Sequence, residues 1–158
     1  MRATENRLAA AWWVLRIVLG TGLFLAGLDK FFDVLANWSM YLSPLAGRLL
    51  PLAEPVLLRV VGILEMALGL GILTHWTRTA SYLMAAWLLA IAINLAITGN
   101  FWDLVLRDVE IATSAFVLGR LTAWRREAAL AESHQSEAFS DGGVVTRKLE
   151  GGPRTRPA

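Results

Sequence analysis

Four long apolar stretches constrain this chain more than any other feature. A helix rises about 1.5 Å per residue, so about 20 apolar residues can cross the roughly 30 Å hydrocarbon core of a bilayer. The stretches that meet this length are residues 8–28, 55–74, 77–98 and 101–123. Of all residues 56% are hydrophobic and 18% are charged, whereas about a quarter are charged in a soluble domain. We therefore predict an all-α integral membrane protein in which residues 1–126 form a four-span bundle.

Two of these stretches carry charges that affect how they are interpreted. The first could be a cleaved signal peptide, but Arg16, two tryptophans and the lack of a small-residue cleavage site before Asp29 disfavour that alternative. The fourth is the least hydrophobic, with four charged residues in its first half. We expect it to depend on the other three spans for partners.

The segments outside the spans differ in composition. Residues 29–50, between spans 1 and 2, are apolar with a helical period, which predicts a short amphipathic helix lying in the membrane–water interface. An ordered loop across the mouth of the bundle is the alternative. Residues 127–158 mix both charge signs with Gly and Pro, so we predict a polar tail that is largely disordered after a frayed helical start.

Basic residues near the span ends predict the orientation. One side has six of them, and the other side has only Lys30 and Arg48. The six are Arg2, Arg7, Arg78, Arg120, Arg125 and Arg126. Because basic residues favour the cytoplasmic side, we expect both the N- and C-termini there.

Ionisable residues within the spans are the candidate functional residues. Each costs roughly 2.5 to 3.5 kcal/mol at the centre of a membrane helix, so they are expected to face one another. Their depths predict a buried ion-pair network of Arg16, Glu65 and Glu110, in which Arg16 and Glu65 pair directly or share the network. Nearer the outer side, a polar pocket is predicted from Arg59, Asn94, Arg107 and Asp108. A solid ion-paired core without a cavity is the alternative.

Small residues share helical stripes with some of these charges. In the first span Gly20 and Gly27 lie on the stripe of Arg16 and Lys30, and in the second Gly62 and Gly69 flank Glu65. In the fourth span Asp108 shares its stripe with Ala112, Ala115 and Gly119, whereas Asp103, Arg107, Glu110 and Ser114 follow a second stripe. Helices approach closely along small residues, so the first three stripes are expected to face the bundle.

The remaining composition restricts the chemistry. With no cysteine, the chain forms no disulfide, thiol nucleophile or iron–sulfur centre. Its two histidines, His75 and His134, lie far apart in the sequence, so we expect no metal site and no cofactor of the chain's own. The basic end of the tail fits anionic lipid better than nucleic acid.

Four motifs together resemble a known family. They are LRIVLGTGLFLAGLDKFF, GILEMALGLGIL, AWLLAIAINL and WDLVLRDVEIATSAFVLGRL, one in each span. Their order and spacing over about residues 12–123 resemble the DoxX-like family of small bacterial membrane proteins. The resemblance implies a four-helix bundle in the bacterial cytoplasmic (inner) membrane. The family takes its name from a subunit of a quinone-reducing thiosulfate oxidoreductase, and other members are linked to membrane redox assemblies.

The resemblance leads to a first expectation of function. We expect an accessory or anchoring subunit of a membrane redox complex, linked to quinone and not catalytic by itself, with a protein partner or further copies of itself. The alternative is a subunit that binds a quinone or a similar lipophilic molecule. A small transporter is a weaker third possibility, because the chain is short and has no inverted repeat.

Overall fold

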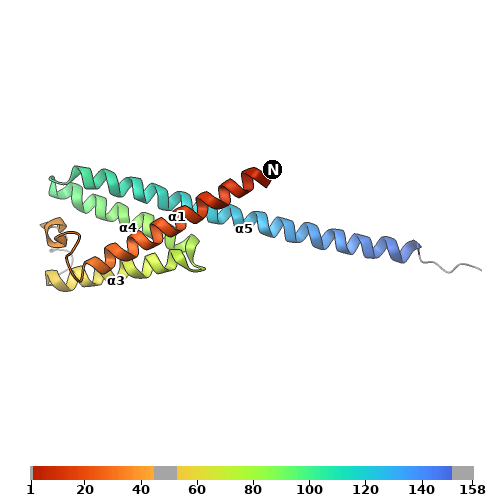
Figure 1. Cartoon of the computed structure of the whole chain (residues 1–158), viewed down its shortest axis with the longest axis horizontal. Coiled ribbons are helices and arrows are strands. Elements are labelled where there is room, and N and C mark those ends of the chain that lie inside the picture. The colour runs from red at the N-terminus through yellow and green to blue at the C-terminus, as the bar shows by residue number, and fades with distance from the viewer. Residues whose placement is uncertain (1, 45–52, 151–158) are drawn as a thin grey trace, which may run out of the picture. The chain divides into compact units, whose positions relative to one another are not determined.

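The described part of the chain is helical. The computed structural model describes residues 2–44 and 53–150, and within these residues it contains no strand. Its elements are α1 (Arg2–Asp29), the 3₁₀ helix η1 (Trp38–Tyr41), α3 (Glu54–Leu73), α4 (Thr77–Thr98) and α5 (Trp102–Glu150) (Figure 1). The chain divides into two compact units, residues 1–122 and 123–158.

Three of these helices are long and apolar enough to cross a membrane. The qualifying segments are Arg7–Asp29, Glu54–Leu73 and Thr77–Thr98, which match the first three predicted spans within a few residues. The fourth predicted span is helical in α5, but its charges keep it from meeting the same criterion. That residues 101–123 cross the membrane therefore stays a prediction.

Glycines bring α1 and α3 into backbone contact. A Cβ atom built on Gly27 would lie 2.5 Å from the Gly62 carbonyl oxygen, and one on Gly69 would lie 2.7 Å from the Gly20 oxygen. Gly20 thus faces Gly69 and Gly27 faces Gly62, which makes the two helices antiparallel. The prediction that these glycine stripes face another helix is confirmed.

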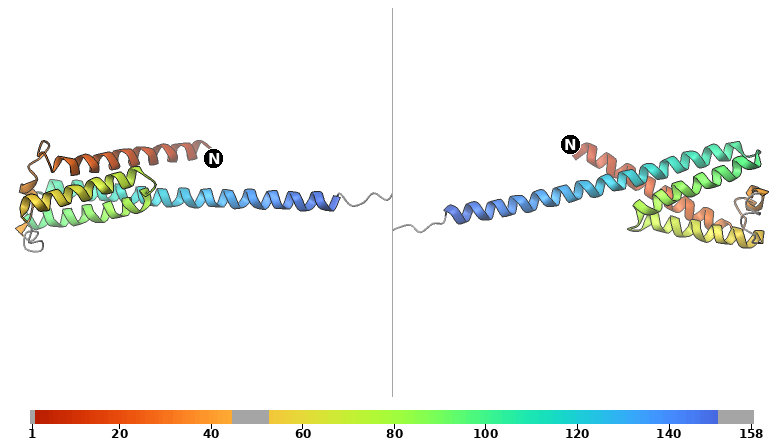
Figure 2. Two further views of the ribbon diagram at one scale, coloured as in Figure 1. Left: turned by 90° about the horizontal axis from the view of Figure 1, so that it is seen from below. Right: turned by 180° about the vertical axis from the view of Figure 1, so that it is seen from behind.

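The remaining helices complete the core of residues 1–122. Helices α3 and α4 are joined by the short turn at His75 and lie side by side, and α4 lies beside the first part of α5 (Figure 2). Gly119 of α5 is in contact with the Tyr82 ring of α4. The Trp12 indole donates a hydrogen bond of 2.8 Å to the Thr122 hydroxyl, which links α1 to α5. The buried core is mostly aliphatic, and it includes Leu19, Leu23, Ile72, Met84, Leu88, Ala112, Ala115 and Leu118.

The segment after α1 is a loop with one short 3₁₀ helix. The amphipathic helix predicted between spans 1 and 2 is not present over residues 31–43. The Asp29 carboxylate instead accepts hydrogen bonds from the backbone N–H groups of Val34 and Leu35, and Asp33 has φ of 50°. These bonds compete with a helical ladder and close a turn. The part of the predicted helix at residues 45–50 lies outside the described residues.

This loop packs on helix ends, as in the alternative prediction. The Tyr41 ring meets the Phe101 ring edge to face with centroids 5.1 Å apart.

In the second unit, α5 continues as a helix to Glu150, further than the frayed start predicted for the tail. The sequence after Arg126 begins EAALAE, which favours helix, and the first proline beyond it is Pro153.

Candidate functional site

A buried ion pair lies between α1 and α3. Lys30 Nζ is 2.5 Å from Glu65 Oε2, and the two side chains are 6% and 3% exposed. The glycine contact explains why they meet. A Cβ atom on Gly62 would lie 3.2 Å from the Lys30 Cβ, so Lys30 packs directly over Gly62, and Glu65 follows one helical turn later.

Two tryptophans surround this pair. Lys30 Nζ lies 3.6 Å from the centroid of the Trp38 ring, a cation–π contact. The Trp38 indole also donates to Asp29 Oδ2 at 2.8 Å, which holds the ring in place. From α4, the Trp87 indole donates to Glu65 Oε1 at 3.4 Å. The ammonium and the carboxylate are thus each in contact with a second group.

A second buried carboxylate comes from α5. The Asp108 side chain is 4% exposed, and its Oδ1 accepts bonds from Arg107 Nε at 3.0 Å and Nη2 at 2.9 Å. Glu65 of α3 is in contact with both Lys30, at the end of α1, and Trp87 of α4, and α5 contributes a separate ion pair, Arg107 with Asp108. We call these five residues the central cluster.

Arg16 has a different role from the predicted one. The Glu65 carboxylate pairs with Lys30, whereas Arg16 donates to three backbone carbonyls at the end of α3. Its bonds reach the oxygens of Ile72 at 2.9 Å, Leu73 at 2.6 Å and Thr74 at 2.5 Å. A helix C-terminus has unsatisfied carbonyls and a partial negative charge, so a guanidinium stabilises it. The predicted direct pair of Arg16 with Glu65 is replaced by the pair of Lys30 with Glu65.

The four residues of the predicted outer pocket are only partly brought together. Asn94 holds the loop to α4, donating to the Tyr41 carbonyl at 2.8 Å and accepting from the Ser43 N–H at 3.2 Å. Arg59 is exposed on α3. Arg107 and Asp108 pair directly, although we expected neighbours about 100° apart on a helix to need partners from other spans. The long arginine side chain folds back to its neighbour.

Glu110 does not join the buried network. Its side chain is exposed on α5, as are those of Asp103 and Arg107. By contrast, Asp108 and the three small residues of its stripe are all buried. The stripe of Asp108 therefore faces the bundle, and the stripe of Glu110 faces outward.

Sequence reasoning missed four contributors to the site. Lys30 was predicted only as part of a stripe and as a basic residue of the outer side, and Asp29, Trp38 and Trp87 were not predicted to belong to a site. One signal bears on the places of Lys30 and Arg16, the pairing of the glycines. In the register where Gly20 faces Gly69 and Gly27 faces Gly62, Arg16 lies opposite residue 73, and Lys30 lies opposite residue 59, just beyond Gly62.

The chemistry open to the central cluster is ion pairing and hydrogen bonding. Within residues 7–44 and 53–135, no group of three or more His, Asp or Glu side chains is placed to hold a metal ion. In the same residues, Ser81 Oγ is the one buried side-chain oxygen or nitrogen without a hydrogen-bond partner. The buried charges are thus engaged by one another.

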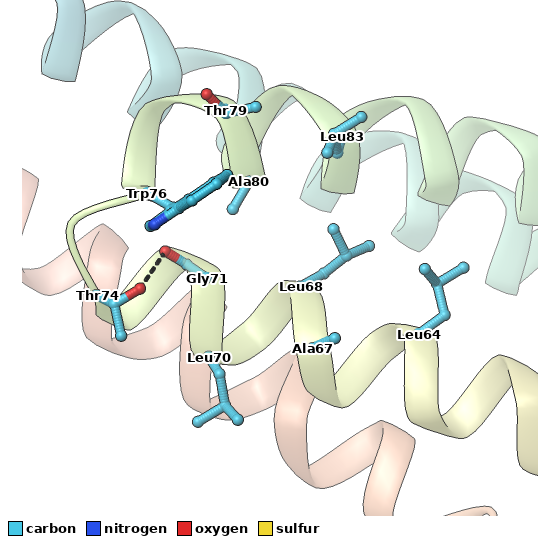
Figure 3. A pocket seen from close by; sticks show the side chains of 10 residues that line it. All are labelled: Leu64, Ala67, Leu68, Leu70, Gly71, Thr74, Trp76, Thr79, Ala80 and Leu83. Atoms are coloured by element: carbon cyan, nitrogen blue, oxygen red, sulfur yellow. Dashed lines mark hydrogen bonds between the residues drawn. The ribbon is translucent and has the colours of Figure 1, made fainter.

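A groove lies elsewhere on the bundle, between α3 and α4. It has a volume of about 320 Å³ and is almost entirely apolar, with Trp76 and Ala80 on one wall and Leu64, Ala67 and Leu68 on the other (Figure 3). Thr74 and Thr79 lie toward the end near the turn. None of the residues predicted as site residues lines it.

No family model, curated protein or solved structure matches this chain. The likeness to DoxX-like proteins consequently rests on the four motifs and their order.

Proposed function

We propose that this chain is an accessory or anchoring subunit of a membrane redox complex. The observation that carries the proposal is the central cluster, where Lys30 is engaged by Glu65 and Asp108 by Arg107. Removing one member of a buried ion pair typically costs 3–5 kcal/mol, so the pair of Lys30 and Glu65 joins α1 to α3 only while both partners are present. A rigid, internally paired bundle suits a membrane anchor.

The redox class of the complex is proposed from the family resemblance. The chain has no cysteine, so an iron–sulfur or thiol centre of such a complex would belong to another subunit. The apolar helices α1, α3 and α4 would supply the attachment to the bilayer. In this proposal the partner subunit carries out electron transfer, and this chain holds the partner at the membrane.

Co-purification tests the proposal. The tagged full chain, extracted from its native membrane in mild detergent, should bring down an oxidoreductase subunit in fixed stoichiometry, identified by mass spectrometry. In cells lacking this chain, the same subunit should move from the membrane fraction to the soluble fraction. A chain that purifies without a redox protein, and whose deletion leaves membrane oxidoreductases in place, would contradict it.

A matched pair of glycine variants makes this test specific to the bundle. Gly27→Leu should release the redox subunit, since α1 can no longer pack on α3. Gly22→Leu should retain it, because a Cβ at Gly22 meets nothing within 4 Å. Equal retention by both variants would show that the bundle is not what binds the partner.

The groove between α3 and α4 favours a second candidate function, binding of a quinone or similar lipophilic molecule. Small-molecule sites are typically apolar clefts of about 300–1,000 Å³ with a few polar groups, here Thr74, Thr79 and the Trp76 indole. Solvent extraction of the purified chain should then yield quinone. Ala67→Phe, which fills the groove, should lower the yield, and Ala11→Phe on the exposed face of α1 should not.

A further inference from the structure

The groove between α3 and α4 opens on the outside of the bundle. Both helices are among the segments long and apolar enough to cross a membrane. The side chains at its rim are exposed and apolar, with Leu70 on one side and Trp76 and Leu83 on the other. In a bilayer this opening would therefore meet the acyl chains of lipids.

Water is a poor occupant for most of the groove. A water held in a protein needs several polar partners, and the walls are almost entirely apolar. An apolar chain removes this surface from water at no such cost. The groove consequently suits a hydrocarbon chain.

The length of the groove corresponds to one leaflet of the membrane. Its lining on α3 extends from Leu64 to Thr74, which is about 15 Å at about 1.5 Å per residue. This is about half of the roughly 30 Å hydrocarbon core. One acyl chain of a phospholipid spans the same half, whereas the tail of a quinone with many isoprene units is longer.

The polar groups of the groove gather at the end beside the turn between α3 and α4 (Figure 3). The Thr74 hydroxyl donates to the Gly71 carbonyl at 3.2 Å. Among the described residues, the Thr79 hydroxyl and the Trp76 indole N–H make no hydrogen bond. Two donors are thus left for a ligand, and the ester and phosphate oxygens of a phospholipid are acceptors only.

The charge near this end is positive. Residues 66–102 contain no Asp or Glu, and their one formal charge is Arg78, which is exposed next to Thr79 in the first turn of α4. Arg78 takes part in neither ion pair of the described residues. Arg16 in addition binds the carbonyls at the end of α3, which offsets their partial negative charge. This combination favours an anionic head group over a neutral one.

We propose that the groove binds one acyl chain of an anionic phospholipid, whose head group lies at the membrane surface beside Trp76, Thr79 and Arg78. The predicted orientation places this turn on the cytoplasmic side, where the membrane surface is anionic. The inference rests on the second candidate function, because it names the lipophilic molecule that the groove takes. It is independent of the proposed anchoring role.

A lipid titration tests the groove. The full chain is stripped of lipid in detergent, and native mass spectrometry follows its binding of phosphatidylglycerol or of phosphatidylcholine with the same acyl chains. The wild type should bind phosphatidylglycerol severalfold more tightly. Ala67→Phe, which fills the groove, should weaken binding of both lipids severalfold, whereas Ala11→Phe on the exposed face of α1 should weaken neither.

A pair of arginine variants tests the head group. Arg78→Gln should lower phosphatidylglycerol binding to the level of phosphatidylcholine and leave phosphatidylcholine binding unchanged. Arg7→Gln removes the same charge from an exposed residue of α1, so it should keep the preference. The comparison of the two lipids on the wild type needs no variant, and it holds even where a variant folds poorly.

Three results would each overturn the proposal. They are equal binding of the two lipids by the wild type, unchanged binding by Ala67→Phe, and an unchanged preference in Arg78→Gln. Quinone extraction is read separately. Quinone in the purified chain without a preference for phosphatidylglycerol would support the second candidate function and contradict this inference, and the reverse result would exclude quinone as the occupant.

Discussion

Charged residues have opposite environments in two regions of the bundle. One region is the contact between α1 and α3, and the other is the outward face of α5 with Asp103, Arg107 and Glu110. Lys30 and Glu65 are almost completely buried and pair with each other, whereas Arg107 is about half exposed and Glu110 faces outward. The difference follows the small residues. Where glycines let two backbones touch, charges from one helix reach the next. The stripe of Asp103, Arg107 and Glu110 contains no glycine, and its charges stay on the surface. Burial of an ionisable residue in this bundle is thus decided by its stripe and not by its charge.

The largest effect is expected from breaking the buried pair. Lys30→Met leaves Glu65 buried without its counter-charge, and Glu65→Leu does the same to Lys30, so each should destabilise the bundle by about 3–5 kcal/mol. The double variant should recover much of that loss, because neither charge remains. Equilibrium unfolding in mixed micelles measures all three proteins.

The control for this double-mutant cycle replaces Lys30 by Arg16, which the sequence predicted as the partner of Glu65. Arg16→Met and Glu65→Leu should be nearly additive, since Arg16 binds carbonyls at the end of α3. Strong coupling between Arg16 and Glu65, with additivity between Lys30 and Glu65, would show that the predicted pair is the correct one.

The next largest effect tests the backbone contact itself. In Gly27→Ala the new methyl would lie 2.5 Å from the Gly62 oxygen and 2.9 Å from the Glu65 Cβ, so the helices must separate. Overpacking of this kind typically costs 1–3 kcal/mol. Gly22→Ala has open space and should match or slightly exceed the wild-type melting temperature, because alanine favours helix. Equal melting temperatures for both variants would show that the backbone contact between α1 and α3 does not contribute to the stability of the bundle.

The sequence predicts much of this fold because membrane helices have a strong signal. The three apolar helices, the tight turn at His75 and the stripes of glycine and alanine all followed from length, hydropathy and spacing. The loop after α1 did not, because its course depends on one side chain. Asp29 accepts bonds from Val34 and Leu35, and that local competition is not visible in a hydrophobic period.

The candidate site was less predictable than the fold. Depth along a helix was not enough to identify the partner of Glu65, because that partner depends on the register between α1 and α3, which the glycine pairs fix. Arg107 was expected to reach another span, because neighbouring residues on a helix point in different directions. Its side chain is long enough to fold back and bind Asp108 instead. Asn94 was assigned to a pocket, whereas its amide binds the Tyr41 and Ser43 backbone.

A smaller effect is expected where α4 holds the loop. Asn94→Ala removes the bonds to the Tyr41 carbonyl and the Ser43 N–H, which together should cost about 1–2 kcal/mol. The loss should be local, with faster amide exchange at residues 38–43 than in α3 or α4. Asn100→Ala is the control, since its side chain bonds only to the nearby Thr98 carbonyl among the described residues. Uniform acceleration throughout the bundle would mean that Asn94 supports the core instead.

The smallest effect is expected at Glu110, a carboxylate whose environment differs from that of Glu65. Glu65→Gln removes the charge that faces the buried Lys30 ammonium, so the melting temperature of the monomer in detergent should fall clearly. Glu110→Gln removes a charge that has no ion-pair partner among the described residues and faces outward, so the same measurement should show no change. The pair of variants isolates burial, because residue type and substitution are the same. If Glu110→Gln destabilises the monomer as much as Glu65→Gln, then Glu110 belongs to the interior network that its depth first suggested, and the contrast between the inner and outer faces of the bundle does not hold.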